Sequence, residues 1–316
     1  MRRERSVALA IGALCAALAV YAPKYFSAEN LLDLFLVNGP VLLVALGATL
    51  VILTGEIDIS VGSVFAICSV IGGVAAKTDL SVQTVAAVTC SVGAALGLVN
   101  GALVAYARIP SIVVTLAAMV AYRDALRWVT QGSWVEGLPP RFQWLGFSQA
   151  AFPPIVGGCI VVLLIGLAWT MRNLGIGRAV YATGSNAEGA RLAGVDTSLV
   201  KLSVFAFGGV LTAVGAIVNS ARFNQVPSNT GLGLEMKVIA AVVVGGAAIT
   251  GGRGTVTGTV LGVVLLGAVG PALTFLGVAA QWERALQGAI ILAAVAIDAA
   301  PITRSVIASR RASAGV

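Results

Sequence analysis

Residues 38–76 read NGPVLLVALGATLVILTGEIDISVGSVFAICSVIGGVAA, two long apolar runs on either side of the polar stretch TGEIDIS (54–60). A run of about 20 apolar residues is long enough to cross the hydrocarbon core of a bilayer as a helix. In lipid a helix satisfies its own backbone hydrogen bonds, which an isolated strand cannot do. This stretch therefore predicts two membrane helices whose connection carries two carboxylates, Glu56 and Asp58.

The rest of the chain has the same character. Of its 316 residues, 58% are hydrophobic and 10% are charged, whereas soluble domains have about 25% charged residues. Ten apolar runs are expected to span the membrane, at 6–22, 35–54, 61–76, 83–105, 110–128, 151–170, 201–220, 237–251, 255–277 and 285–300. The sequence therefore predicts an all-α polytopic membrane protein with about ten transmembrane helices, in a single transmembrane domain over residues 1–316.

The first apolar run follows three arginines, Arg2, Arg3 and Arg5. A signal peptide has the same arrangement, and the tripeptide ALA at 17–19 would suit its cleavage site. Because a chain with many later spans usually keeps its first one, we expect an uncleaved helix.

The placement of lysine and arginine predicts the orientation of the chain, because these residues gather on the cytoplasmic side. With a cytoplasmic N-terminus, twelve of the 20 basic residues fall inside and eight outside. The fifth span is the weakest, because it runs into Arg123, Asp124 and Arg127. Without it the basic loop 171–200 and the basic C-terminus would face outwards, so we retain it. Both termini and the loop 171–200 are therefore predicted to be cytoplasmic, and the loop 129–150 external.

Two parts of the chain resemble each other. The TG and GSV of residues 54–64 recur as the TG and GTV of residues 250–260, at a constant offset of 196. Six expected spans separate the two copies, so both would have the same orientation in the membrane. We therefore expect a parallel repeat of 35–76 and 237–277, related by an axis along the membrane normal.

The residue types present exclude several kinds of site. The chain has no histidine, which excludes His-based acid–base catalysis and His-ligated metal sites, and no metal is expected. Its four cysteines lie in apolar runs and have no CxxC spacing. No lysine follows a glycine, so the Gly-Lys-Ser/Thr phosphate loop is absent and ATP would have to bind to another chain. The basic residues flank apolar runs, which indicates contact with the lipid bilayer and no role in binding nucleic acid.

The connection at 54–63 is a candidate functional segment. An ionisable group inside a bilayer is costly and is by default a functional-site hypothesis, which applies to Glu56 and Asp58. Gly55 and Gly62 would let the backbone break here, and Ser60 could cap the helix that follows. A tight cytoplasmic turn with two solvated acids is the alternative, and periodicity alone does not decide between them.

A second pair of charges, Glu235 and Lys237, lies at the outer end of the eighth expected span. These side chains could pair with other groups or face an aqueous vestibule. For Lys237, extension of its long side chain to the membrane surface is the simpler interpretation.

The inner loop contains ATGSNAEGARLAGVDTSLVK at 182–201. Ser185 or Asn186 can cap a short helix that runs through Glu188 and is ended by Gly194. Such a helix, exposed on the cytoplasmic face, could dock into a groove on a partner protein. An amphipathic surface helix without a partner is the alternative.

Four motifs in this order resemble the permeases of carbohydrate-type ABC importers, which carry ribose, xylose, rhamnose and autoinducer 2. They are TGEIDISVGS (54–63), YATGSNAEGARLAGV (181–195), GLGLEMKVIAAVVVGG (231–246) and GGRGTVTGTVLG (251–262). The resemblance extends from about residue 35 to residue 300. WVEGLPP (134–140) and GLEMKVIAA (233–241) are most similar to the autoinducer 2 and rhamnose permeases. Glu56 departs from the pattern, since many relatives have a small or neutral residue there.

The resemblance implies a set of partners. Two permease subunits, identical or similar chains, would form the translocation path in the bacterial inner membrane, and an extracytoplasmic solute-binding protein would deliver a sugar-like solute. A cytoplasmic ATPase dimer would bind the ATP and dock on a coupling helix within residues 184–195. The residues of this loop that the resemblance assigns to coupling are Gly184, Asn186, Glu188, Ala190, Arg191 and Gly194.

A polar solute needs hydrogen-bond partners along its path. We therefore expect Asn38, Glu56, Asp58 and Ser60 to line the translocation pathway. In this interpretation the chain is a transport subunit without catalytic residues. An ion-gradient-driven secondary transporter is the alternative, in which the membrane acids would relay protons. A membrane-embedded enzyme is disfavoured, because no nucleophile–base constellation is recognisable.

Overall fold

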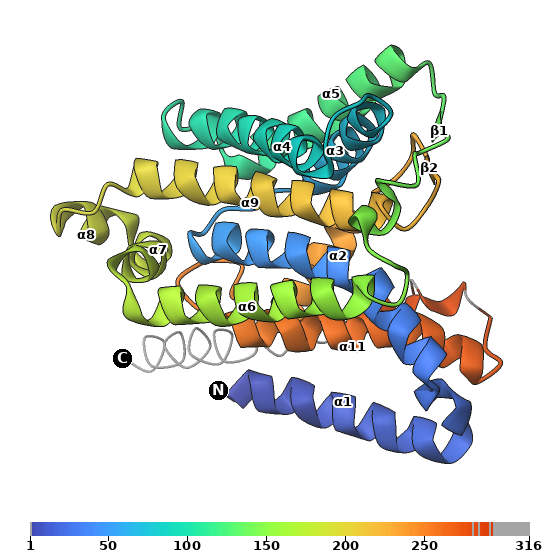
Figure 1. Ribbon diagram of the computed structural model, residues 1–316. Helices are drawn as coiled ribbons and strands as arrows, with labels where there is room; N and C mark the ends of the chain where they lie inside the picture. The colour runs from blue at the N-terminus through green and yellow to red at the C-terminus, as the bar shows by residue number, and fades with distance from the viewer. Residues whose placement is uncertain (1, 280, 284, 291, 293–316) are drawn as a thin grey trace, which may run out of the picture.

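The computed structural model describes residues 2–279, 281–283, 285–290 and 292, and within them the chain is almost entirely helical. Long helices lie side by side in a bundle (Figure 1). The helices are α1 (Arg2–Tyr21), η1 (Pro23–Phe26), α2 (Ala28–Leu53), α3 (Val61–Ala76), α4 (Val82–Ala105), α5 (Ser111–Thr130), η2 (Gln143–Gly146), α6 (Phe152–Asn173), α7 (Gly175–Ser185), α8 (Ala187–Leu192), α9 (Thr197–Ser220), α10 (Leu234–Val244) and α11 (Val256–Phe275). The prediction of an all-α polytopic membrane protein is confirmed.

Six of the described helices are long and apolar enough to cross a bilayer on their own: α1, α2, α4, α6, α9 and α11. The bounds of α3 match the expected span 61–76, but its 16 residues are fewer than the about 20 that a perpendicular span needs. α5 has 20 residues and contains three charged side chains in its second half. The count of ten crossings and the side on which the termini lie stay predictions, and the expected span 285–300 lies mostly outside the described residues.

α2 is the central helix of the bundle. Residues 43–53 of this helix are all buried, so it is apolar around its whole circumference, as a helix without a lipid-facing side must be. It packs against α9 where Gly47 faces Gly208, and a Cβ at Gly47 would lie 2.8 Å from the Cα of Gly208. On the other side of α9, Gly93 and Gly97 of α4 lie against backbone carbonyls of α9. Small residues thus allow three helices to approach closely in the core.

One expected span is wrong in its extent. The apolar run 237–251 predicts a continuous helix, but α10 ends at Val244 and has only 11 residues. The chain then turns through glycines with positive φ, among them Gly246 (φ +102°) and Gly251 (φ +84°), which L-residues with a side chain rarely adopt. The loop closes on itself, since Ala248 donates its N–H to the Arg253 carbonyl at 2.8 Å.

The loop after α10 meets the end of α2. Gly252 donates its N–H to the carbonyl of Leu53 at 2.9 Å. Gly55 (φ +83°) and Gly251 lie in direct backbone contact, and a Cβ on Gly251 would be 2.6 Å from the Gly55 nitrogen. Gly184 of α7 packs against the same Leu53 carbonyl. Two non-helical connections, α2–α3 and α10–α11, therefore touch each other and α7 at one point.

The two ends of the bundle differ (Figure 1). At one end α7 and α8 project beyond the long helices. At the other, β1 (Val135–Glu136) pairs antiparallel with β2 (Gln225–Val226). The backbone N–H of Trp144 also donates to the Ala221 carbonyl at 2.6 Å. The expected outer loop, 129–150, is thus a structured segment fastened to the end of α9.

Candidate functional site

α8 is the exposed tip of the molecule. The Oδ1 atom of Asn186 accepts a hydrogen bond from the Gly189 N–H at 2.9 Å, which caps the helix. Gly194 follows the helix with φ +85°. The predicted short helix is therefore confirmed, with Asn186 as its cap, whereas Ser185 is the last residue of α7.

The outer face of α8 carries both charge and apolar surface. Arg191 Nη2 lies 2.7 Å from Glu188 Oε1, and both side chains are exposed. Leu192 is 81% exposed, while Ala190 is buried on the opposite face. An uncovered leucine beside an ion pair is the composition of a surface that another protein can cover.

α7 connects α8 to the long helices of the bundle. Gly184 packs on the end of α2, and the Tyr181 hydroxyl donates to the Gly254 carbonyl at 2.9 Å. Burial raises the pKa of the Tyr181 phenol, with a smaller contribution from the Glu4 carboxylate, so the hydroxyl remains a neutral donor at physiological pH. Glu4 in turn accepts hydrogen bonds from Thr255 and Thr257, the first at 2.5 Å. The beginnings of α1 and α11 therefore lie at the α7–α8 end.

A cavity of about 390 Å³ opens beside α8. Glu56 from the α2–α3 connection and Lys201 from α9 form an ion pair inside it, with Lys201 Nζ 2.5 Å from Glu56 Oε1. The two side chains are only 14% and 22% exposed. Arg108 and Arg191 line the same cavity. Through Glu56, the candidate pathway segment contacts the start of α9. Its partner Lys201 is four residues after Thr197, where α9 begins.

Asp58 and Ser60 belong to a chain of polar contacts in the interior. One carboxylate oxygen of Asp58 accepts from the Ser60 N–H at 2.9 Å and from its hydroxyl at 2.6 Å. Asn100 of α4 donates to the Ser60 hydroxyl at 2.8 Å, and the Tyr122 hydroxyl of α5 donates to Asn100 at 3.1 Å. Ser60 occupies the N-cap position of α3 without capping it. The expected cap is therefore wrong: Ser60 has helical φ and ψ (−74° and −9°), its hydroxyl oxygen accepts from Asn100, and the Ser63 N–H bonds to the Ser60 backbone carbonyl.

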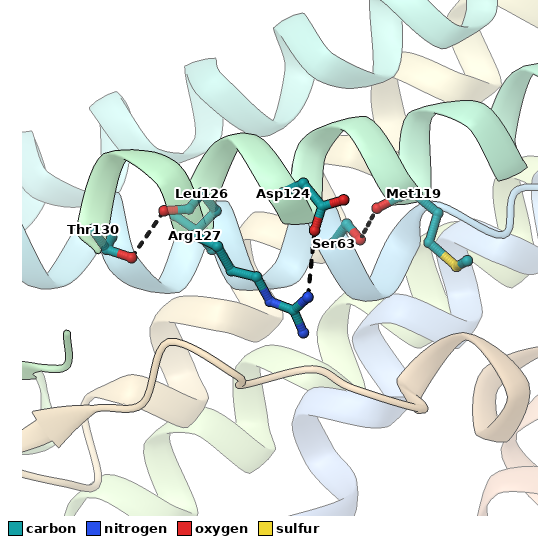
Figure 2. A network of polar contacts seen from close by, with 6 residues as sticks. All are labelled: Ser63, Met119, Asp124, Leu126, Arg127 and Thr130. Atoms are coloured by element: carbon teal, nitrogen blue, oxygen red, sulfur yellow. Dashed lines mark hydrogen bonds and ion pairs between the residues drawn. The ribbon is translucent and has the colours of Figure 1, made fainter. Parts of the chain in front are cut away.

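α5 holds the same segment from the other side. The Ile57 N–H donates to Ser111 Oγ at 3.1 Å, and Thr115 Oγ1 donates to the Ile57 carbonyl at 3.2 Å. Figure 2 shows Ser63 of α3 pointing at the Met119 carbonyl, to which it donates at 2.7 Å. The two bonds to Ile57 satisfy backbone groups that no helix pairs, as irregular backbone in a membrane protein requires.

Of the charged side chains in the second half of α5, one lies in the protein interior and two lie at the exposed surface. Arg123 is 7% exposed and donates to the Thr230 carbonyl at 2.8 Å. Asp124 and Arg127 are exposed and pair with each other at 3.3 Å (Figure 2). The charges that weaken the fifth expected span are therefore matched within the protein.

Asn38 lies apart from the other three candidates. It is on α2, 15 residues before the helix ends at Leu53, which is about 22 Å along the helix axis. It lines a cavity of about 410 Å³ together with Asp33, Lys237 and Glu283. The structure therefore distributes the four candidates over three places: the cavity beside α8, the interior network and a hollow near the opposite end.

The sequence does not predict the contacts of several polar residues in these three places. Asn100 and Tyr122 are single polar groups in apolar runs, and nothing in their spacing connects them to Ser60. Lys237 is visible as a charge at the edge of a run, but its role depends on a cavity that only packing creates. Glu235 lies against Gly62 of α3, where a Cβ would overlap its carboxylate.

Comparison with known proteins decides the family. The sequence model of the family described as "Branched-chain amino acid transport system / permease component" matches residues 30–295. The chain belongs to this permease family. The resemblance noted from the four sequence motifs is thereby confirmed, and the permease is a transport subunit and not an enzyme.

Individual permeases are also similar in sequence to this chain. It is 36% identical over 302 residues to the autoinducer 2 import system permease protein LsrC of Photorhabdus laumondii, which covers 94% of this chain and 89% of the relative. It is 37% identical over 296 residues to the protein of the same name from Yersinia pseudotuberculosis, covering 94% and 84%. No solved structure matches the permease. Family and apolar helices together identify a multi-pass protein of the bacterial inner membrane.

Proposed function

We propose that the permease is the transmembrane subunit of a binding-protein-dependent ABC importer for a sugar-like solute of the autoinducer 2, rhamnose or ribose type. The similarity to autoinducer 2 import permeases over 94% of the chain is the observation that carries this proposal. Its partners would be a cytoplasmic ATPase dimer that binds the ATP, a second permease subunit of the same or a similar chain, and an extracytoplasmic solute-binding protein.

In this proposal the ATPase docks on α8. The helix offers Glu188, Arg191 and the 81% exposed Leu192 to a partner. Behind it, Gly184 of α7 contacts the end of α2 close to the loop that follows α10. A displacement of α8 would therefore act on both non-helical connections at once, which is the kind of rigid-body coupling that switches a two-state transporter.

The solute would pass along polar groups of these connections. We propose Glu56, Asp58 and Ser60 as groups of the inner part of the pathway and Asn38 as a group of its outer part. The supporting observation for Asp58 and Ser60 is that they form a largely buried hydrogen-bond chain, with the carboxyl group of Asp58 at one end, in a membrane protein. An acidic group in such a position usually has a functional reason.

Reconstitution tests the proposal. The permease is placed in liposomes with and without the ATPase, and both preparations receive ATP and a binding protein loaded with labelled solute. We expect accumulation of labelled solute only with the ATPase and hydrolysable ATP. Accumulation by the permease alone under an imposed proton gradient would contradict the proposal and favour the secondary transporter.

A further inference from the structure

The hollow that contains Asn38 lies at the end of the molecule remote from α8. Its volume is about 410 Å³, and α2, α10 and α11 form its walls. Asn30, Asp33, Asn38, Lys237, Thr274 and Glu283 supply its polar lining. α11 begins at Val256 beside α7 and ends with Phe275 at this hollow; its 20 residues extend about 30 Å along the axis.

The charged side chains that line this hollow do not form hydrogen bonds with one another within the described part of the chain. Within the described part of the chain, Asn38 Oδ1 is buried and has no hydrogen-bond partner, while its Nδ2 donates to the Leu34 carbonyl at 2.9 Å. No described hydrogen bond or ion pair joins Lys237 to Asp33 or to Glu283 at contact distance. The Oδ1 atom of Asn38 lies against the backbone of Gly267 and has almost no accessible surface, so the polar groups left for a bound molecule are those of Asp33, Lys237 and Glu283.

Two glycines of α11 allow side chains of the lining to pack close to the helix. A Cβ at Gly267 would overlap the Asn38 amide, and a Cβ at Gly270 would lie 2.6 Å from Glu283 Oε2. These two glycines therefore allow polar side chains to lie against the helix backbone. Phe275 and Pro271 add apolar surface to the same wall. Apolar walls with a few convergent polar groups are typical of small-molecule sites, whose volumes are about 300–1,000 Å³.

Lys237 connects this hollow to a second one. The neighbouring hollow has about 270 Å³, and it shares Val37 and Lys237 with the first. Lys237 lies in the first turns of α10, a helix of 11 residues whose first buried residue is Val238, and Leu232 and Met236 beside it are 69% and 68% exposed. Lys237 is therefore at the accessible start of the helix, where it can contact a molecule in either hollow.

We propose that the hollow lined by Asp33, Asn38, Lys237 and Glu283 is a solute-binding site of the permease for an uncharged polyhydroxylated molecule. The inference rests on the proposed function and deepens it. The Asp33 and Glu283 carboxylates accept hydrogen bonds from hydroxyls, the Lys237 ammonium donates to them, and Phe275 and Pro271 contact the carbon skeleton. With two carboxylates and one ammonium in the lining, an anionic sugar acid or sugar phosphate is disfavoured.

Uptake by variants gives the first test, in the reconstituted importer with ATPase and binding protein. The probes are labelled autoinducer 2, ribose and rhamnose, with the sugar acid ribonate as the anionic control. Lys237→Gln removes a polar partner, while Asn38→Leu and Gly267→Ala change the wall of the hollow where the Asn38 amide packs against α11. The matched control is Gly166→Ala on α6, where a Cβ would meet nothing within 4 Å.

We expect each cavity variant to lower maximal uptake of the transported probe by about tenfold or more, because its hydroxyls lose a partner or the wall of the hollow changes. ATP hydrolysis and ATPase binding should remain normal in these variants, and Gly166→Ala should transport like the wild type. Wild-type uptake by all three cavity variants, or efficient uptake of ribonate, would overturn the inference.

Thiol labelling gives a second test that does not depend on transport. In a background without the four native cysteines, Thr274→Cys lines the hollow, and Val162→Cys on α6 is a control with a 71% exposed side chain that we expect to face lipid. A membrane-impermeant methanethiosulfonate should modify only Thr274→Cys, and the probes should slow this modification. Protection without ATP-dependent uptake would support the site while refuting the importer. ATP-dependent uptake of a probe that does not protect Thr274→Cys would refute the proposed site and leave the importer function standing.

Discussion

Lys201 on α9 lies with its ammonium nitrogen 2.5 Å from a carboxylate oxygen of Glu56 in the connection between α2 and α3. The pair joins the segment that follows the central helix to the helix that follows α8. Lys201 is the fifth residue of α9, so a movement of α8 that carries the start of α9 with it would also pull on Glu56. We therefore regard this ion pair as a contact that depends directly on the position of α8.

The first prediction concerns this pair. Glu56→Lys and Lys201→Glu should each destabilise the permease by about 1–3 kcal/mol, because a partly buried charge loses its partner and meets a like charge. The double exchange should recover more than half of the loss, since the attraction is restored in reverse. Thermal unfolding of the four proteins in detergent measures the coupling. Additive losses in the double variant would mean that the pair contributes nothing.

The second prediction concerns the interior polar chain. Asn100 is fully buried and links Ser60 to Tyr122. Asn100→Leu should lower stability by about 2–4 kcal/mol, because it leaves the two hydroxyls of its neighbours without their partner. Ser91→Ala on the same helix removes only an exposed hydroxyl that bonds its own backbone, and should change stability by less than about 0.5 kcal/mol. Equal losses in the two variants would argue against the network.

The third prediction concerns the glycine junction. Gly251→Ala places a Cβ 2.6 Å from the Gly55 nitrogen at a backbone conformation with φ +84°, which should cost about 1–3 kcal/mol. Solute uptake should also fall, because the added Cβ disturbs the contact through which α7 would act on both connections. Gly158→Ala on α6 meets nothing within 4 Å and serves as the control. Uptake at the wild-type rate by Gly251→Ala would show that the junction tolerates a side chain.

The fourth prediction concerns ATPase docking. Leu192→Asp changes a side chain that is 81% exposed, so the folded permease should be as stable as the wild type. Co-purification with the ATPase should nevertheless fall by about tenfold or more, because the apolar contact is replaced by a charge that must be desolvated. Undiminished co-purification would exclude Leu192 from the docking surface. Leu199→Asp, which alters another exposed apolar side chain at the same end, tests whether the effect is specific to α8.

Hydropathy and spacing predict those parts of the fold that depend on local chemistry. The bounds of α3 and the Asn186 cap follow from residues next to each other in the chain. The run AVVVGGAAIT at 241–250 misleads, because a buried irregular loop is as apolar as a buried helix. Only the glycine conformations at 246 and 251 separate the two.

The candidate site is predicted less completely, because its polar groups meet through packing. Glu56 and Asp58 stand out as acids between apolar runs, but their different partners, Lys201 and Ser60, follow from the way α9 and α3 lie. Asn38 gains a neighbour in Lys237, 199 residues further along the chain, only because α2 packs beside α10. The sequence contains no local signal for such a meeting.

The junction of Gly55, Gly184 and Gly251 has a further consequence. Where three backbones touch, no flexible side chain lies between them to absorb a displacement. A displacement of α7 would therefore shift the α2–α3 and α10–α11 connections directly, because their backbones are in contact. Small ligands wedged at this point would therefore be expected to freeze the importer in one state, which makes the junction a rational target for inhibitors.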